Sequence, residues 1–551
     1  MEQVLTPESL TTNQLVEPCP DLGYTKLYLN FLAGRSPAID FYPSRSLPEV
    51  AQQLDHHSYQ REQIVGILRK QNSRYNASAE TFVNIDKLTD PRAVCVFAGQ
   101  QAGLMGGPLL TLIKALAIVK AAAIYSEELN RPVVPIFWIA GDDHDFLEAN
   151  HTYLLDRQGN VTRVAYESNP DSQVSMSELK MSDKDELARL ISEVQETLGQ
   201  SDFTPDLYEL LERSYSTKDT MVTAFGQYMA GLTEELGLVL FNPGDPEAKK
   251  LAAPLFRSIV ENQDSMHESL TAANEQLQNA GYHIQVEKSD DSTHLFYHSN
   301  GRQPIKRDGE RFTIGEESLN RDQLLERIDT NPAGFSPDVL TRPILQSYLF
   351  PVLTQKCGPS EIAYFAQLNS FFKLYDLPTP VHMARPSMTI LESRIAAHME
   401  EMGLKYKDLC GDIEQVINQV LSKSFPDTLE QDFEKLKNAV AEKFENFSEE
   451  ALDFDPSLKD FSKQTFGKIE YALKAFEGKV FSAHKKKSQD TRNRIYRIGN
   501  SLHPERNMQE RVLNISYFLS RYGMNLIRYI YDRLDSEQTA HQLFSLSEYE
   551  A

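Results

Sequence analysis

An acidic loop offers the clearest chemistry in this 551-residue sequence. Residues 141–151 read Gly-Asp-Asp-His-Asp-Phe-Leu-Glu-Ala-Asn-His, which places four carboxylates and two imidazoles within eleven residues. Crowded carboxylates repel one another, so proton affinities in such a loop are perturbed and suit a general base. We predict that Asp143 and His144 are catalytic and that Asp142 binds substrate. Mg²⁺ held through one or two carboxylates fits the same loop, as does simple capping of a helix by Asp142 or Asp143.

A glycine-rich loop at residues 99–107 has four glycines in nine residues and precedes an expected helix. Glycines let a backbone approach a ligand closely, and the first turn of a helix offers free N–H groups to an anion. A lysine about two turns into that helix can reach back to the same site. The loop matches neither a P-loop nor the GxGxxG spacing, and a tight turn needed only for packing is the alternative. The predicted residues are Gln100, Gly103 and Gly107 for substrate binding and Gln101 and Lys114 for catalysis.

A third segment, residues 357–361, reads Cys-Gly-Pro-Ser-Glu and opens another expected helix. Gly-Pro-Ser at a helix start can form an anion-binding nest. Capping of the helix by Ser360 explains the same residues. Arg385 follows a short strand expected around residues 381–384, and it is predicted to bind a substrate carboxylate through two parallel hydrogen bonds.

Parallel strands are expected to position these loops. Short apolar runs at residues 93–98 and 133–140 flank a helix at 108–129, with Pro108 at its first position, and this order predicts a right-handed parallel crossover. A third strand is expected at 237–241. In parallel α/β sheets ligands bind beyond the carboxyl ends of the strands, where the glycine-rich and acidic loops both lie. The remaining expected elements are a mostly helical segment at 156–232, a small β insertion at 281–312 and a helix at 360–374.

A helical arm is expected at residues 387–503, where strand patterns disappear. One helix carries apolar residues at heptad spacing, and an earlier helix shows the same pattern. Because Pro426 and Pro456 fall in the connections, we predict an antiparallel coiled coil; ordinary amphipathic helices on a globular core are the alternative. Residues 504–551 are expected to form a helix that returns to the core at residues 1–386. The heptad positions are Leu429, Phe433, Leu436 and Val440, followed by Phe466, Ile469, Leu473, Phe476, Val480 and Ala483.

The composition narrows the classes of partner. A net charge of −23 argues against nucleic acid as the main partner, because phosphate neutralisation needs a basic face. The most apolar stretch, residues 109–125, is interrupted by Lys114 and Lys120 and is too short and too charged to span a bilayer. The first 16 residues contain no basic residue, which is wrong for a secretory signal. The four cysteines form no CxxC pair, so a cytoplasmic location is expected.

At these motifs the sequence resembles the bacillithiol-biosynthesis cysteine-adding enzymes, from about residue 13 to the C-terminus. Three departures stand out. Asp142 replaces the family's usual Glu, Gly106 replaces a usual Thr, and residues 357–361 replace Gly-Gly-Pro-Gly-Glu. The shorter side chain of Asp142 changes the reach of that carboxylate. The segments that carry the resemblance are residues 99–109, 137–146, 335–343, 358–368 and 509–511.

The resemblance implies a ligase that joins cysteine to glucosaminyl-malate, the last step to bacillithiol. It also implies a Rossmann-like α/β core with insertions, a coiled-coil domain that supports a homodimer, and nucleotide binding. ATP or ADP is the expected nucleotide, with Mg²⁺ possible. We predict its pocket at Gly358, Ser360, Glu361, Arg511 and Asn514, because Arg511 can bind phosphate through two hydrogen bonds.

Two other functions remain as alternatives. One is a metal-dependent nucleotidyltransferase or hydrolase that uses residues 142–151. The other is a non-catalytic scaffold of the thiol pathway.

Overall fold

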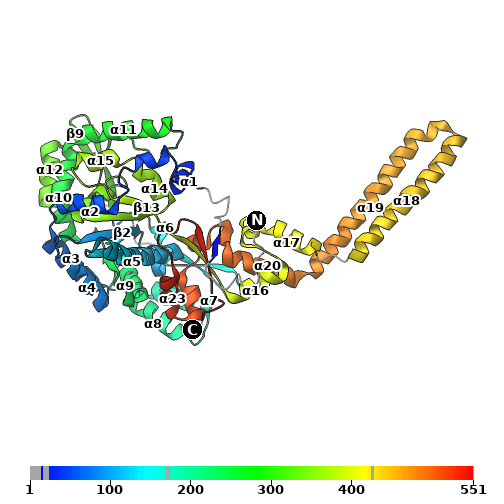
Figure 1. Cartoon of the computed structure of the whole chain (residues 1–551), viewed down its shortest axis with the longest axis horizontal. Helices are drawn as coiled ribbons and strands as arrows, with labels where there is room; N and C mark the ends of the chain where they lie inside the picture. The colour runs from blue at the N-terminus through cyan, green and yellow to red at the C-terminus, as the bar shows by residue number, and fades with distance from the viewer. Residues whose placement is uncertain (1–13, 17–23, 169–173, 300, 424–426, 550–551) are drawn as a thin grey trace. The chain divides into compact units, whose positions relative to one another are not determined.

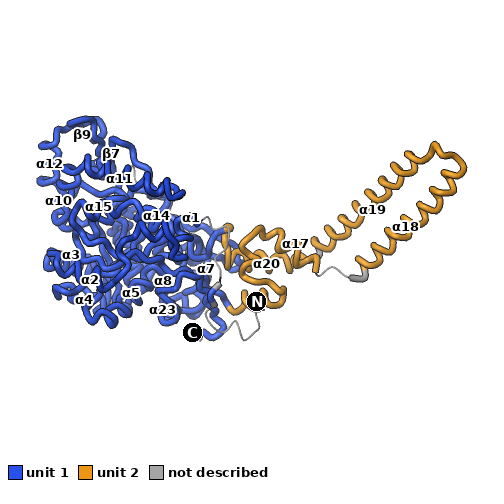
Figure 2. Tube along the Cα trace, turned by 45° about the horizontal axis from the view of Figure 1, so that its top comes forward, with its two compact units in different colours: residues 1–392, 507–551 blue, residues 393–506 orange. Residues whose placement is uncertain are grey.

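A computed structural model describes residues 14–16, 24–168, 174–299, 301–423 and 427–549 of the chain. It divides into two compact units, Met1–Glu392 with Asn507–Ala551, and Ser393–Arg506 (Figures 1 and 2). The family-like loops of the sequence all belong to the first unit. Cys19 and Pro426 lie outside the described residues.

The centre of the first unit is a five-stranded parallel sheet of order β13-β12-β2-β3-β6. Successive residues of a strand face opposite sides of a sheet. Val94, Val96 and Ala98 accordingly enter one hydrophobic core, and Cys95 and Phe97 enter another. Because both faces are covered, the strands are continuous apolar runs, as the sequence predicted. The strands are β2 (Val94–Gln100), β3 (Val133–Ile139), β6 (Val239–Phe241), β12 (Val352–Cys357) and β13 (Val381–Ala384).

Helix α5 (Leu109–Leu129) is the crossover between β2 and β3 and packs against both strands. Pro108 is its N-cap rather than its first residue. Among the described residues α5 alone is long and apolar enough to cross a membrane, but 72% of its most apolar window is buried inside the protein. The helix is therefore the central core helix of this unit. The N-terminal helices of the unit are α1 (Lys26–Leu32), α2 (Leu47–Asp55), α3 (Arg61–Arg74) and α4 (Ala79–Lys87).

The topology places a switch point between β2 and β12. The chain runs from β2 outward through β3 to β6 and then returns to the other side of β2 to form β12 and β13. In such sheets the carboxyl ends of the two strands at the switch diverge and leave room for a ligand. The glycine-rich loop follows β2 and residues 358–361 follow β12, so both border the switch.

The segment expected to be helical at 156–232 is only partly so. It begins within an antiparallel hairpin of β4 (His151–Leu155) and β5 (Val161–Ala165), ahead of three helices. The expected helix at 360–374 is divided into α14 (Pro359–Phe365) and α15 (Asn369–Leu374). The other helices here are α6 (Phe146–Ala149), α7 (Lys184–Leu198), α8 (Thr204–Ser214), α9 (Met221–Leu232), α10 (Pro246–Glu261) and α11 (Gln263–Asn279).

The expected β insertion is a five-stranded antiparallel sheet of order β10-β9-β8-β7-β11. It extends past residue 312 and recruits β11, which precedes α13, so the insertion is tied to the chain that enters β12. Within its hairpin β7–β8, His298 is opposite Arg302. The elements are β7 (Ser292–Ser299), β8 (Gly301–Asp308), β9 (Arg311–Ile314), β10 (Glu317–Asn320), α12 (Arg321–Thr330), β11 (Phe335–Pro337) and α13 (Arg342–Leu349).

The boundaries of the C-terminal regions differ from those expected. Residues 387–391, assigned to the helical arm, form strand β14 (Ser387–Leu391) of the first unit. That strand pairs in parallel with β15 (His541–Ser545), which also pairs with β1 (Gln14–Val16). The last segment is therefore not a helix alone. Its helices are α21 (Gln509–Val512), α22 (Ile515–Tyr522) and α23 (Asn525–Arg533).

The second unit is helical. Its long helices α18 (Asp427–Phe454) and α19 (Lys459–Lys487) are joined by a short 3-10 turn that contains Pro456 and pack together as a coiled-coil arm (Figure 2). Phe433 contacts Phe476 and Phe444 contacts Phe466, with ring centroids 6.2 and 5.3 Å apart. These pairs confirm the antiparallel seam. The other helices are α16 (Ser393–Met402), α17 (Ile413–Lys423) and α20 (Gln489–Leu502).

Candidate functional site

The glycine-rich and acidic loops meet at the carboxyl ends of β2 and β3. These strands are paired up to Gln100 and Ile139, so the residues that follow them emerge side by side. Gln101 Nε2 donates to Asp143 Oδ2 at 2.7 Å and to Glu148 Oε2 at 3.0 Å. The prediction that the two loops lie at one site is confirmed by these contacts.

Asp143 and His144 are partly exposed, with side chains 32% and 33% exposed, and Asp145 and Glu148 of the same loop are more exposed. Asp143 Oδ1 accepts a hydrogen bond from the backbone N–H of His144 at 2.9 Å. His144 Nδ1 lies 3.7 Å from the same oxygen and has no hydrogen-bond partner among the described residues. Nδ1 is itself shielded from solvent, so the pair presents the Asp143 carboxylate and the exposed part of the His144 ring, and their catalytic roles remain predictions.

Helix capping belongs to a third acidic residue of this loop. Asp145 is the N-cap of α6, and its Oδ1 accepts from the backbone N–H of Glu148 at 3.2 Å. The capping alternative therefore applies to Asp145 and not to Asp142 or Asp143. Among the residues that the structure describes, no three His, Cys, Asp or Glu side chains are placed to hold a metal ion.

Asp142, predicted to bind substrate, is already paired. Its Oδ2 accepts from Lys249 Nζ of α10 at 2.6 Å; Lys249 is almost fully buried and Asp142 is largely buried. Burial lowers the pKa of Lys249, and Asp142 only partly opposes that shift. Sequence reasoning missed Lys249, although a lysine on the apolar face of α10, between Ala248 and Ala252, was a signal that it had a buried partner.

Lys114 reaches back from α5 as predicted, and three acceptors surround its ammonium. They are Gly99 O at 2.8 Å, Gln100 Oε1 at 3.1 Å and Glu361 Oε2 at 2.8 Å. Burial would raise the pKa of Glu361, but Lys114 and then Arg342 outweigh it, so the pKa is lowered and the carboxylate is charged. Lys114 therefore joins the ends of β2 and β12 across the switch point. Its predicted catalytic role remains a prediction.

The glycines of the first loop have a packing role, which was the alternative explanation. A Cβ on Gly103 would lie 2.9 Å from the Gly107 Cα, and Gly107 has φ +72°. Asn514 donates from Nδ2 to Met105 O at 2.8 Å and to Gly107 O at 2.6 Å. The first amide of α5, at Leu109, donates to Leu513 O at 2.8 Å. Gly103, Gly107 and Asn514 thus help to fix the loop, and their assignment to ligand binding remains a prediction.

The arrangement at residues 358–361 also differs from the expected nest. Gly358, not the exposed Ser360, is the N-cap of α14. Its backbone N–H donates to Glu361 Oε2 at 2.8 Å, so this amide is occupied and a carboxylate stands beside it. The capping alternative is therefore wrong for Ser360, and an anion at this helix start would meet Glu361.

Arg385, predicted to bind a substrate carboxylate, binds an internal one. Its Nη2 donates to Glu510 Oε1 at 2.7 Å and its Nη1 to Pro386 O at 2.8 Å. Both partners of this ion pair are almost completely buried. Arg511, the next residue along, is exposed. The charges of Glu510, Arg385 and Arg511 all act on Tyr24, whose pKa is raised chiefly by burial, so these groups form one neighbourhood.

Two residues from the β insertion complete the surroundings of the acidic loop. Arg302 Nη1 lies 3.7 Å from Asp143 Oδ1. His298 lies near Asp142 and Lys249, whose charges act on its pKa. No motif announces either residue, because they are more than 150 positions away in the sequence and are brought here by the fold.

Comparison with known proteins agrees with this architecture. The family model for the N-terminal Rossmann-like domain of bacillithiol biosynthesis BshC matches residues 19–386, and the model for its C-terminal coiled-coil domain matches residues 388–546. Similar proteins carry the name "Putative cysteine ligase BshC". One from Koribacter versatilis is 31% identical over 92% of this chain and 95% of its own length. One from Geobacillus kaustophilus is 30% identical over 93% and 96%. One from Bacillus cereus strain AH187 is 27% identical over 96% and 98%. The chain, with its parallel-sheet core and coiled-coil arm, therefore belongs to the BshC family of bacillithiol biosynthesis.

Proposed function

We propose that this protein is a carbon–nitrogen ligase that adds cysteine to glucosaminyl-malate by forming an amide, the last step to bacillithiol. Family membership and the names of its relatives as cysteine ligases support the reaction class. The observation that carries the proposal is the contact of Gln101 with Asp143 beside the unpartnered Nδ1 of His144. It places two proton acceptors where a Rossmann-like sheet binds its ligands.

The reaction requires proton removal at this place. The new bond joins the cysteine carboxyl carbon to the sugar nitrogen, while one carboxylate oxygen and two ammonium protons are lost. The amine attacks only in its neutral form, so a base must take its proton. We assign this role to the imidazole of His144, whose side chain is 33% exposed, and we assign to Asp143, 3.7 Å from its Nδ1, the stabilisation of the resulting imidazolium. Gln101 holds Asp143 in place by its hydrogen bond.

The cysteine carboxylate is a poor electrophile, so its activation would need a nucleotide, and the carboxylate oxygen would leave on a phosphate group. We propose that ATP fills this role and that Arg511 contacts its phosphates, since Arg511 is exposed and next to the buried Arg385–Glu510 pair. Gly358 lies on the same side, because a Cβ there would be 3.8 Å from Arg385 Nε. Asn514 is left out of this proposal, since its side chain is spent on the glycine-rich loop.

The metal-dependent alternative gains no support from the side chains of the acidic loop. Asp142 is bound to Lys249, and Asp143 accepts from Gln101 and lies near Arg302. Lys249 therefore already balances the charge of Asp142, and Asp143 is already a hydrogen-bond acceptor. A cytoplasmic site of action is part of the proposal, because the four cysteines form no CxxC pair.

Reconstitution tests the proposal. The purified protein is incubated with L-cysteine, glucosaminyl-malate and ATP, and mass spectrometry follows a product that contains both substrates less one water. We expect the product only when all three are present. Its absence with every nucleoside triphosphate would contradict the ligase proposal. Product formation in a cell lysate, but never by the pure protein, would favour the scaffold alternative.

A further inference from the structure

The hairpin β7–β8 carries two polar side chains from the β insertion toward the acidic loop. His298 and Arg302 are directly opposite each other in this antiparallel pair, so they lie on the same face of the hairpin. Both reach the buried hydroxyl of Ser336 on β11, His298 Nε2 at 2.7 Å and Arg302 Nε at 3.4 Å. The hairpin tip is thus braced against the strand that leads into α13.

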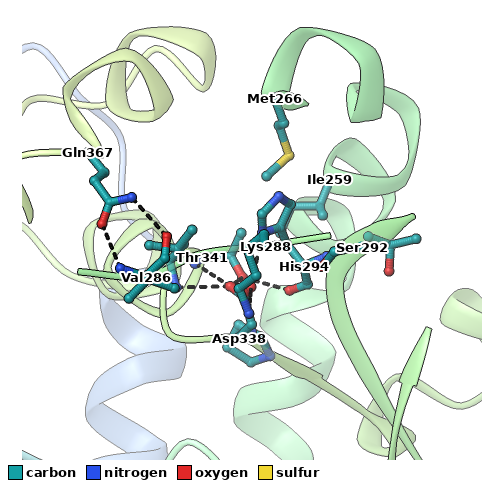
Figure 3. A network of polar contacts seen from close by, with 12 residues as sticks. Ile259, Met266, Val286, Lys288, Ser292, His294, Asp338, Thr341 and Gln367 are labelled. Carbon is teal, nitrogen blue, oxygen red and sulfur yellow. Dashed lines mark hydrogen bonds and ion pairs between the residues drawn. The ribbon is translucent and has the colours of Figure 1, made fainter. Parts of the chain in front are cut away.

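A buried polar network fixes the base of the same hairpin (Figure 3). Asp338 Oδ2 accepts from His294 Nδ1 at 2.9 Å and pairs with Lys288 Nζ at 2.9 Å. Its Oδ1 accepts from the backbone N–H and the hydroxyl of Thr341, at 2.9 and 3.0 Å. A buried carboxylate with this many partners tolerates little displacement. The network therefore fixes strand β7 against the segment between β11 and α13.

Arg302 is largely buried yet incompletely satisfied. Its side chain is 12% exposed, and its guanidinium stacks 3.9 Å from the centre of the Phe296 ring. Nη2 donates to Pro337 O at 3.0 Å, and Nε bonds to Ser336. The nearest carboxylate oxygen to Nη1 belongs to Asp143, at 3.7 Å, which is beyond hydrogen-bond distance. Within the described part of the chain, Nη1 has no hydrogen-bond acceptor.

A partly buried guanidinium with unused donors is costly unless an anion binds it. The other cations nearest the acidic loop are already used, since Lys249 is bound to Asp142 and Lys114 to Glu361. Arg302 Nη1 therefore combines positive charge with free donors close to Asp143. Arginine binds carboxylates through charge-assisted hydrogen bonds of defined geometry.

We propose that Arg302 is a binding residue for a substrate carboxylate, which it holds beside Asp143 and His144. The inference rests on the proposed function, in which cysteine and the malate moiety both carry carboxylates. His298 acts as a positioning residue, since it reaches Arg302 through the shared hydroxyl of Ser336. The insertion thereby contributes to substrate selection in addition to enlarging the core.

The experiment measures binding and turnover separately. Wild type, Arg302→Gln and Arg302→Lys are titrated with glucosaminyl-malate, with L-cysteine and with methyl glucosaminide, which has no carboxylate. Calorimetry is the main measurement. Fluorescence of Trp138, the single tryptophan, four residues before Asp142, provides a second signal. Arg307→Gln, on the same strand but paired with Asp264 at the surface, is the matched control.

We expect Arg302→Gln to weaken binding of one carboxylate substrate by about 10- to 100-fold. Arg302→Lys should restore only part of it, and binding of methyl glucosaminide should be unchanged. A loss confined to glucosaminyl-malate identifies a malate carboxylate, and a loss confined to cysteine identifies the amino-acid carboxylate. Unchanged binding of both substrates overturns the inference, as does a lower kcat with unchanged binding.

Failure of the inference differs from failure of the proposed function. If wild type binds glucosaminyl-malate and Arg302→Gln does not, the binding role stands even where no amide forms. If wild type and Arg302→Gln form product with equal KM for both substrates, the ligase proposal stands and the role of Arg302 is wrong.

Discussion

Asp142, Asp143 and His144 are consecutive, but their side chains have three different environments. Asp142 is buried against Lys249, Asp143 accepts from Gln101, and His144 Nδ1 has no partner among the described residues. A residue whose bonds are all internal contributes to stability, whereas one with unused capacity is available to a ligand. Replacing each of the three should therefore have different consequences.

Asp143→Asn and His144→Ala are expected to abolish ligation and leave the fold intact. Both side chains are about one-third exposed, so we expect the free energy of unfolding to change by less than about 1 kcal/mol. Product formation and thermal melting of the purified variants measure the two effects. Asp145→Asn is the control, because it removes a charge from the same loop while asparagine remains a good N-cap. Near-normal product formation by Asp143→Asn or His144→Ala would refute the assigned roles.

His298 should impose a pH dependence on stability. Burial, with Lys249 and Arg302 adding to it and Asp142 opposing, lowers the pKa of His298 from 6.5 to about 4. As the pH falls below 6.5 the unfolded chain gains a proton that the folded chain refuses until about pH 4. Stability is therefore lost across this window, by up to about 3 kcal/mol.

Denaturant unfolding at several pH values checks this shift. His298→Asn should flatten the decline in stability between pH 6.5 and 4, while His283→Asn, at an exposed position, should keep the wild-type decline. Equal slopes for wild type and His298→Asn would contradict the prediction.

Sequence reasoning located the acidic residues because strand ends are legible in sequence, but it could not see their partners. Lys249 and Arg302 come from elements more than 100 residues away, and only the fold brings them to Asp142 and Asp143. For the same reason Arg385 was assigned to a substrate carboxylate, although Glu510 supplies one from within the chain.

The ends of β2 and β12 diverge at the switch point, and one buried ion pair spans them. Lys114, on the helix after β2, bonds to Glu361, on the helix after β12, at 2.8 Å. Gly99 O and Gln100 Oε1 satisfy the other two donors of the ammonium. The pair therefore sets the separation of the two loops that border the site.

Breaking this pair from one side should be more harmful than removing it altogether. Lys114→Met leaves the largely buried Glu361 without its ion-pair partner, and we expect a loss of about 3–5 kcal/mol in unfolding free energy. The double variant Lys114→Met with Glu361→Leu should lose less than the sum of the single changes. Denaturant unfolding provides the values, and Lys250→Met, which breaks the exposed Lys250–Glu247 pair, should leave the midpoint almost unchanged. Additive losses would show that the two groups are not coupled.

The buried strands were predictable because a strand covered on both faces is a short continuous apolar run. Elements that depend on tertiary pairing were not. Residues 387–391 form β14 because β15, about 150 residues later, pairs with them. The segment expected to be mostly helical, residues 156–232, begins in the turn of the hairpin β4–β5, and β5 is a strand because it pairs with β4.

The helical arm leaves large apolar side chains uncovered within its own unit. Phe447, Phe454 and Phe461 are 68%, 90% and 68% exposed, although the seam between α18 and α19 is filled. Exposed aromatic residues on a coiled coil are typical of a surface that packs against another chain. We propose that a second copy of this protein covers them.

Light scattering should therefore give about twice the 62.7 kDa mass of one chain at micromolar concentration. Phe447→Ser combined with Phe461→Ser should shift the protein toward monomer without loss of helix, because both side chains lie outside the seam. Lys435→Ser, at an exposed polar position of α18, is the control. A monomer in the wild-type sample would end the dimer proposal.

The central claim is that this protein attaches cysteine to glucosaminyl-malate, and a thiol profile of cells that lack it tests this most directly. We predict that such cells lose bacillithiol and accumulate glucosaminyl-malate, and that a plasmid copy of the wild-type gene restores the thiol whereas Asp143→Asn, expressed to the same level, does not. Normal bacillithiol in the deleted cells, or full restoration by Asp143→Asn, would contradict the account.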